Sequence, residues 1–204
     1  MAVKQDDKGR THIDWELDGI TPKMIDWWWA NMEKGFPLWH PTEHTDFYWH
    51  KQPEGDQVLG TIHVAPQIWS DGTMIKPHIR FENVADLPAD VQELIVYEHA
   101  IVVAGINLTG ENFKEDDPAL AYRVHQWESI DSGVRGLSSA VPVEPEPLEK
   151  GLVWAKHGQE EVGYWQDFLA ELYKLWRVIK NPKLNPYFSF KISRDGNTLK
   201  YAAL

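Results

Sequence analysis

Residues 156–179 read KHGQEEVGYWQDFLAELYKLWRVI, and this stretch decides the fold. Its large apolar side chains recur every three or four residues, which is the spacing of one face of an α-helix. These side chains are Val162, Trp165, Leu169, Leu172, Trp176 and Ile179. Pro182 follows them and stops the helix, because proline has no backbone N–H to donate. The sequence therefore predicts a long amphipathic helix that buries one face against the rest of the protein.

Strand patterns occur before and after this helix. The four clearest runs are 58–67, 73–82, 119–128 and 133–141. Residues 94–107 are predicted as a buried strand or a helix, because periodicity does not separate the two in a short apolar run. A hairpin is expected around the Asp195-Gly196 turn. Antiparallel strands with one long helix indicate an α+β fold, in which a curved sheet wraps around the helix and leaves an internal cavity.

Shorter segments complete the expected organisation of the chain. Residues 1–13 are expected to be a loose leader. A helix is predicted over Pro22–Lys34, with Thr21 as its N-cap and Gly35 as its C-cap. The Pro- and Glu-rich stretch Val141–Glu149 is expected to be a connector that is too short to separate domains. All 204 residues are therefore predicted to form one domain.

The composition argues against several classes of protein and of site. The chain has 20 basic and 31 acidic residues and a formal charge of −11, which argues against nucleic acid or an anionic membrane as a partner. It has no cysteine, which excludes disulfides, thiolate nucleophiles and Cys-ligated metals, and fits a cytoplasmic location. No apolar run approaches the ~20 residues of a membrane span. The 11 tryptophans indicate a large aromatic core, an aromatic cavity, or both.

The sequence lacks a Gly-rich phosphate loop, a serine nucleophile elbow and an HExxH motif. Hydrolysis would therefore most economically use a metal to activate water. His157 and Glu161 are the best candidate ligands, because their i, i+4 spacing places them on one helix face at the start of the apolar stripe. Imidazole and carboxylate groups are good ligands for zinc. The alternative is a solvated pair on the surface of the helix.

Other histidines form a second set of candidates. The block WHPTEH, residues 39–44, places His40 and His44 four residues apart. They are either two ligands, one ligand and one structural histidine, or loop histidines packed by nearby tryptophans. His63 lies in a predicted strand. His125 alternates with large neighbours in another strand and is predicted to point into a cavity as a proton donor.

Three blocks of the chain occur in a recognisable order. They are Gly19–Trp29 (GITPKMIDWWW), Leu38–His44 (LWHPTEH) and His157–Tyr173 (HGQEEVGYWQDFLAELY). Together they resemble the diacetylphloroglucinol hydrolase and phloretin hydrolase family over most of the chain, most loosely across 85–155. The resemblance implies a helix-grip fold, like that of START-type lipid-transfer domains, and one bound zinc. It also implies hydrolysis of the carbon–carbon bond between an acyl group and a phenolic ring, a retro-Claisen type reaction.

The same resemblance implies the zinc ligands, which are two histidines and two glutamates in that family. By position, His44 matches the first histidine, and His157 and Glu161 match the closing pair. The second glutamate is expected on the strand after WHPTEH, where this chain reads GTIHVAPQIW and has no glutamate. His63 or Gln67 is therefore predicted to replace it. This departure leaves three alternatives open: an altered metal site, a different reaction, or no metal at all.

The predicted reaction needs further side chains in the cavity. His125 is the candidate acid for the leaving ring carbon, and Glu43 and His40 are candidate supporting or base residues. The predicted aromatic walls are Trp28, Trp39, Phe47, Trp69, Trp127 and Trp165. The expected partner is a small aromatic or polyketide-like substrate, and a homodimer is one option for the assembly state. A cyclase or isomerase, and an aromatic-ligand binding protein without chemistry, are alternative functions on the same fold.

Overall fold

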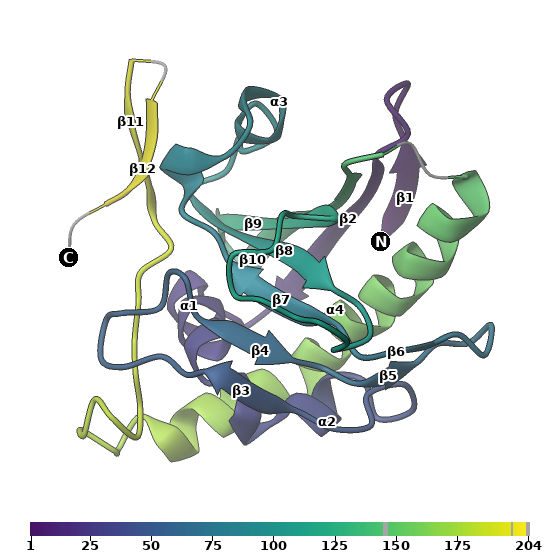
Figure 1. Cartoon of the computed structure of the whole chain (residues 1–204). Helices are drawn as coiled ribbons and strands as arrows, with labels where there is room; N and C mark the ends of the chain where they lie inside the picture. Colours follow the sequence, from purple (N-terminus) through teal and green to yellow (C-terminus); the bar gives the residue numbers. More distant parts are fainter. Residues whose placement is uncertain (145–146, 197, 203–204) are drawn as a thin grey trace.

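The computed structural model describes residues 1–144, 147–196 and 198–202. Its main feature is an eight-stranded antiparallel sheet that curves around one long helix, α4 (Leu148–Trp176), as Figure 1 shows. In spatial order the strands are β1 (Ala2–Gln5), β2 (Thr11–Asp18), β10 (Gly133–Pro142), β9 (Ala121–Ile130), β8 (His99–Asn107), β7 (His78–Phe81), β4 (Ile62–Val64) and β3 (Tyr48–Lys51). The predicted α+β, helix-grip (START-like) architecture is confirmed.

Shorter elements surround the sheet and the long helix. The helical ones are α1 (Pro22–Ala30), η1 (Met32–Lys34), α2 (Phe36–Trp39), η2 (Val84–Asp86) and α3 (Ala89–Gln92). Two hairpins are formed by β5 (Gln67–Ile68) with β6 (Met74–Ile75), and by β11 (Ile192–Asp195) with β12 (Thr198–Tyr201). Helices α1 and α2 connect β2 to β3 and pack against α4 (Figure 1). Side chains from these three helices can therefore meet beside the sheet.

The N-terminal segment differs from the sequence-based expectation. Residues 1–13 are not a loose leader, because β1 pairs antiparallel with β2 along its whole length. In β2, Ile13, Trp15 and Leu17 alternate with more exposed residues, and all three are buried. A period of two is the mark of a half-buried strand. The expectation was wrong because the residues before this alternation are mostly polar and show no strand pattern of their own.

Several element boundaries are set by tertiary contacts. The ambiguous run 94–107 contains strand β8, which pairs with β7 on one side and β9 on the other. Helix α4 begins at Leu148 rather than near Lys156, and residues 145–146 of the expected connector lie outside the described residues. The helix predicted over Pro22–Lys34 is split into α1 and η1. The terminal hairpin is confirmed as β11 and β12. In the described part of the chain, no helix is long and apolar enough to cross a membrane.

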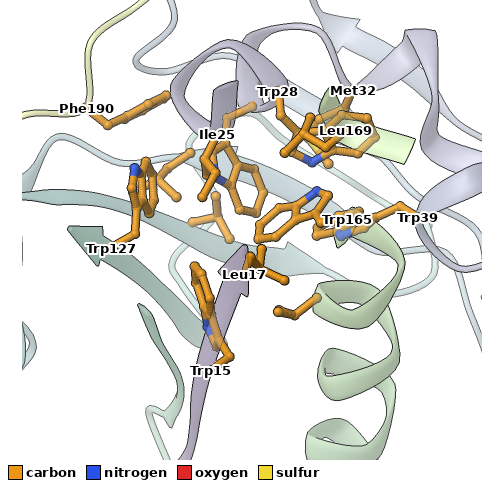
Figure 2. Packing of buried hydrophobic residues seen from close by; sticks show 14 of the residues in the cluster. Trp15, Leu17, Ile25, Trp28, Met32, Trp39, Trp127, Trp165, Leu169 and Phe190 are labelled. Atoms are coloured by element: carbon orange, nitrogen blue, oxygen red, sulfur yellow. The ribbon is translucent and has the colours of Figure 1, made fainter. Parts of the chain in front are cut away.

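The core lies between the sheet and α4, and tryptophan dominates it (Figure 2). Trp165, in the centre of the α4 stripe, is 0% exposed. Its ring stacks on Trp39 with centroids 5.4 Å apart and meets Trp15 edge-on at 6.0 Å. Trp15 crosses β10 at Gly136, where a Cβ would lie 2.0 Å from its ring, so that a larger residue does not fit. The Trp15 indole N–H donates to Ser138 Oγ at 3.0 Å, which fixes the ring against β10.

Candidate metal centre

A cavity of about 440 Å³ lies between the sheet and the N-terminal half of α4. This volume falls in the range of small-molecule sites. Its aromatic wall is formed by Trp29, Phe36, Trp39, Trp69 and Trp154. Its polar side chains include His63, Gln67, His125, His157 and Glu161. The cavity therefore places a flat apolar surface next to several of the predicted site residues.

Three of the predicted ligands, His44, His157 and Glu161, come together beside this cavity. One ligand atom from each lies within 4.8 Å of the other two. Nε2 of His157 is 3.1 Å from Oε1 of Glu161, and Nε2 of His44 is 3.2 Å from the same oxygen. His157 and Glu161 are one turn apart on α4, whereas His44 comes from the loop between α2 and β3. All three side chains are buried.

Outer contacts determine which nitrogen of each histidine faces this cluster. Nδ1 of His157 donates to Glu43 Oε2 at 2.7 Å, and Nδ1 of His44 donates to the Phe36 carbonyl oxygen at 3.2 Å. Because an ionised carboxylate and a carbonyl only accept hydrogen bonds, both Nδ1 atoms carry protons. Both Nε2 atoms face Glu161, and that of His44 is buried without a hydrogen-bond partner among the described residues. Histidines that ligate metals are held in this way.

Charges within the cluster compensate one another. Burial acts to lower the pKa of His157, but the carboxylates of Glu161 and Glu43 outweigh it and raise this pKa above its ordinary value. Burial acts to raise the pKa of Glu161, but His157 and His44 hold it well below its usual range. A divalent cation can replace the proton on His157 Nε2 and still balance the charge of Glu161. The residues present therefore fit a divalent metal such as zinc.

His40 lies behind His157, in a second group with Glu43 whose ligand atoms are also within 4.8 Å of one another. Nδ1 of His40 accepts the Glu43 backbone N–H at 3.2 Å, so its imidazole proton is on Nε2. That Nε2 faces Glu160 Oε2 at 3.2 Å and Glu43 Oε2 at 3.7 Å. Burial and the nearby charge of His157 lower the pKa of His40. A protonated Nε2 cannot ligate a metal, so His40 and Glu43 form an outer layer that orients His157.

The two candidates for a fourth ligand line the cavity beside this cluster. Among the described residues, His63 belongs to neither group of ligand atoms. It stacks on Phe47 with ring centroids 5.5 Å apart, and burial, with a smaller effect of His44, lowers its pKa to about 3. Gln67 forms an isolated β-bridge with His44, and its Oε1 accepts the Trp69 indole N–H at 2.6 Å. The identity of a fourth ligand stays a prediction.

His125 lines the cavity from β9. Its Nδ1 is 2.9 Å from Ser138 Oγ, and that oxygen already accepts the Trp15 indole N–H. Because a hydroxyl oxygen can accept two hydrogen bonds and donate one, this contact fits either tautomer of His125: Ser138 donates to Nδ1, or Nδ1–H donates to Ser138. Burial, opposed by Glu161 and reinforced by Arg123, lowers the pKa of His125 to about 4. Near pH 7 the ring is therefore uncharged, and its role as a proton donor stays a prediction.

The six predicted substrate-binding aromatics fall into two sets. Trp39 and Trp69 line the cavity. The four that do not line it are Trp28, Phe47, Trp127 and Trp165. The three tryptophans of this second set are 0% exposed and belong to the core, so the prediction is wrong for them and for the phenylalanine as cavity walls. Trp29 and Trp154 line the cavity instead, and no sequence signal separates Trp29 from its tryptophan neighbours.

Comparisons with known proteins identify one matching family and proteins of similar structure. Residues 4–140 match a protein family described as DAPG hydrolase PhiG domain, a range that includes His44 and His125 but ends before the pair on α4. No curated protein matches the sequence. Protein Ms6760 from Mycobacterium smegmatis has a similar structure, with a TM-score of 0.58, 15% identity, and coverage of 83% of this chain and 96% of that one. A protein from Arthrobacter aurescens also has a similar structure, with a TM-score of 0.56, 13% identity, and coverage of 83% of this chain and 91% of that one.

Proposed function

The chain belongs to the DAPG hydrolase PhiG domain family, and on that basis we propose that it is a metal-dependent hydrolase. The proposed reaction cleaves the carbon–carbon bond between an acyl group and a phenolic or polyketide-like ring. One observation carries the proposal: two imidazoles and one carboxylate converge within 4.8 Å beside a cavity with an aromatic wall. The proposed substrate is accordingly a small acylated aromatic molecule.

We assign zinc as the cation, held by His44 and His157 through Nε2 and by Glu161 through a carboxylate oxygen. Two nitrogen ligands and one oxygen ligand are typical of catalytic zinc sites. When bound, zinc supplies Lewis acidity, which polarises a substrate carbonyl and lowers the pKa of water. The absence of cysteine from the chain agrees with a site built only from imidazole and carboxylate groups.

The surrounding residues prepare the site before substrate arrives. Glu43 and the Phe36 carbonyl hold the two imidazole rings in the orientation that presents Nε2. Such outer contacts are worth a factor of about 10–100 in metal affinity or activity. Trp39 and Trp69 provide flat walls that exclude water from a bound ring. The chain therefore supplies both alignment of the ligands and an apolar environment.

In the proposed reaction, water adds to the acyl carbon and the bond from that carbon to the ring carbon breaks. The electron pair of the broken bond stays on the ring, which takes up a proton, and the acyl group leaves as a carboxylic acid. Negative charge gathers on ring oxygens ortho or para to the broken bond. His125 lines the cavity and, in the tautomer that carries its proton on Nε2, donates a hydrogen bond to such an oxygen, which stabilises the charge as it develops.

The test combines metal analysis with product analysis. Purified protein should contain about one zinc per chain, and His157→Ala should lose it. Acylated phenols should be converted to a carboxylic acid and the deacylated ring, and chelation should stop this conversion. Full activity after removal of zinc would overturn the metal-dependent mechanism. A product of unchanged mass would favour a cyclase or isomerase, and binding without any product would favour a carrier.

A further inference from the structure

A second depression lies at the opposite end of α4 from the metal centre. It encloses about 740 Å³, is open to solvent, and is formed by α1, the end of α4 and the chain that follows it, in the lower left of Figure 1. Three cationic side chains, Lys23, Arg177 and Lys180, line it together with the aromatic residues Trp27, Tyr173 and Tyr187. At 1.5 Å per residue, about 30 Å of helix separates Arg177 from His157, so this is a separate site.

The positive charge of this depression is not neutralised by carboxylates. Residues 174–183 contain four basic and no acidic residues, although the chain as a whole has a formal charge of −11. Of these four, Arg177 and Lys180 line the depression, whereas Lys174 pairs with Glu171 outside it. Among the residues that the structure describes, Lys23, Arg177 and Lys180 form no ion pair, and no acidic side chain lines the depression. A hollow lined by charges of one sign focuses the field and attracts ions of the opposite sign.

The buried carboxylate of Asp26 lies behind the Tyr187 wall and does not cancel this charge. Its Oδ2 accepts the Tyr187 hydroxyl at 3.2 Å, and its Oδ1 is 2.9 Å from Nδ1 of His99. The residue is 1% exposed, and burial raises its pKa. Its hydrogen bonds are thus directed into the protein, and its carboxylate is not available to the three cations.

The helix dipole accounts for only one of the cations, Lys180, whose Nζ donates to the Arg177 carbonyl oxygen at 2.8 Å. Cations near the C-terminus of a helix are favourable because unpaired carbonyls there carry partial negative charge. At the end of α4, however, Asn185 Nδ2 already donates to the carbonyl oxygens of Trp176 and Ile179, each at 3.0 Å. Lys23 lies in the first turn of α1, where the dipole disfavours a cation and where no acidic residue is present. A ligand anion would remove this unfavourable arrangement.

The aromatic wall of the depression is held in place by local contacts. The Trp27 indole N–H donates to Asn185 Oδ1 at 2.6 Å, and the Trp27 ring meets Tyr173 edge-on with centroids 5.5 Å apart. Nζ of Lys23 lies 5.4 Å from the centroid of the Tyr187 ring. Flat apolar surfaces and cations are therefore combined in one concave site of small-molecule size.

We infer that this depression binds an organic anion in which a flat ring is joined to phosphate groups, as in a nucleoside diphosphate. The guanidinium of Arg177 has the planar fork that binds phosphate oxygens in pairs. Lys23 and Lys180 line the same depression and add two further positive charges. Tyr173 supplies an aromatic surface for the ring, an interaction that tolerates different bases because each has a π-face.

Isothermal titration calorimetry of the full chain with adenosine diphosphate tests this inference. We expect binding with a dissociation constant below about 1 mM, and at least about tenfold weaker binding of adenosine or inorganic pyrophosphate alone. Arg177→Gln should weaken binding of the diphosphate at least about tenfold, since it removes a charge-assisted pair of hydrogen bonds. Tyr173→Leu should weaken binding of the nucleotide but leave that of pyrophosphate unchanged.

Lys183→Gln is the matched control, because it removes one positive charge from the same stretch but does not line the depression. It should change the affinity by less than about twofold at physiological salt. Absence of nucleotide binding at millimolar concentration would overturn the inference. An equal loss in Lys183→Gln and Arg177→Gln would also overturn it, by reducing the effect to net charge. Circular dichroism of each variant verifies that the fold is intact, above all for Tyr173→Leu, because Tyr173 is partly buried against the core.

Discussion

The two ends of α4 differ in the burial and the pairing of their charged side chains. Near its N-terminal half, His157 and Glu161 are buried, and each faces a group of opposite charge. Near its C-terminus, Arg177 and Lys180 are exposed and have no carboxylate beside them in the described structure. Burying an unpaired charge costs several kcal/mol of folding free energy. An exposed ion pair contributes only about 0–1 kcal/mol, so a charge at the surface loses little when it has no partner. The buried charges in the N-terminal half of α4 therefore have to be paired, whereas the exposed cations near its C-terminus can remain unpaired in solvent.

The largest effect is expected from removing the charge of Glu161. Glu161→Gln leaves two imidazoles without their counter-charge and removes a metal ligand, so zinc affinity should fall by at least about 100-fold. Zinc competition against a chelator of known affinity measures this change. Glu171→Gln, on the exposed C-terminal part of α4, is the control and should keep wild-type affinity. Equal affinities in the two variants would show that Glu161 is not a ligand.

A smaller effect on zinc affinity is expected from Glu43, which contacts His157 but is not a predicted ligand. Glu43→Gln keeps the shape of the side chain but removes the negative charge that holds the Nδ1 proton of His157. Zinc affinity should fall by about 10–100-fold while the fold is retained. The same competition assay measures it, with far-ultraviolet circular dichroism as the check on folding. A wild-type affinity would contradict the assignment of Glu43 to the outer layer.

Acidification should destabilise the metal-free protein through its neutral buried imidazoles. The pKa of His63 is about 3 in the folded chain against an ordinary value of 6.5. Between these values the unfolded chain binds a proton that the folded chain does not, so stability falls as pH decreases, by up to about 1.4 kcal/mol per pH unit. His63→Phe should reduce this slope between pH 6.5 and 4. Urea denaturation with a chelator present measures it, and an unchanged slope would refute the prediction.

The smallest effect is expected at the exposed end of the helix. Lys174 pairs with Glu171 on the surface, and both side chains are more than half exposed. Exposed pairs of this kind contribute about 0.5 kcal/mol or less, so Lys174→Gln should change Tm by less than about 2 °C. Differential scanning calorimetry decides this. A loss of several degrees would mean that the charges at this end are not simply solvated.

Part of the candidate site could be predicted from local spacing. The i, i+4 relation of His157 and Glu161 held because both lie on one regular helix, where spacing defines a shared face. Two outer contacts could not be predicted in this way. Glu43 meets His157 from 114 residues away, and Ser138 forms a hydrogen bond with His125 from a neighbouring strand. These contacts depend on strand register and helix packing, which local periodicity does not encode.

The sequence by itself determined the long amphipathic helix, the antiparallel strands, the placement of His157 and Glu161 on one helix face and the absence of thiol chemistry. Only the tertiary structure decided that the first residues join the sheet, that Trp29 rather than Trp28 lines the cavity, and that Lys23 lines the same depression as the cations that follow α4. The physical reason is the range of each interaction. Side-chain spacing acts within one element, whereas cavities and charge clusters arise where faces of distant elements meet.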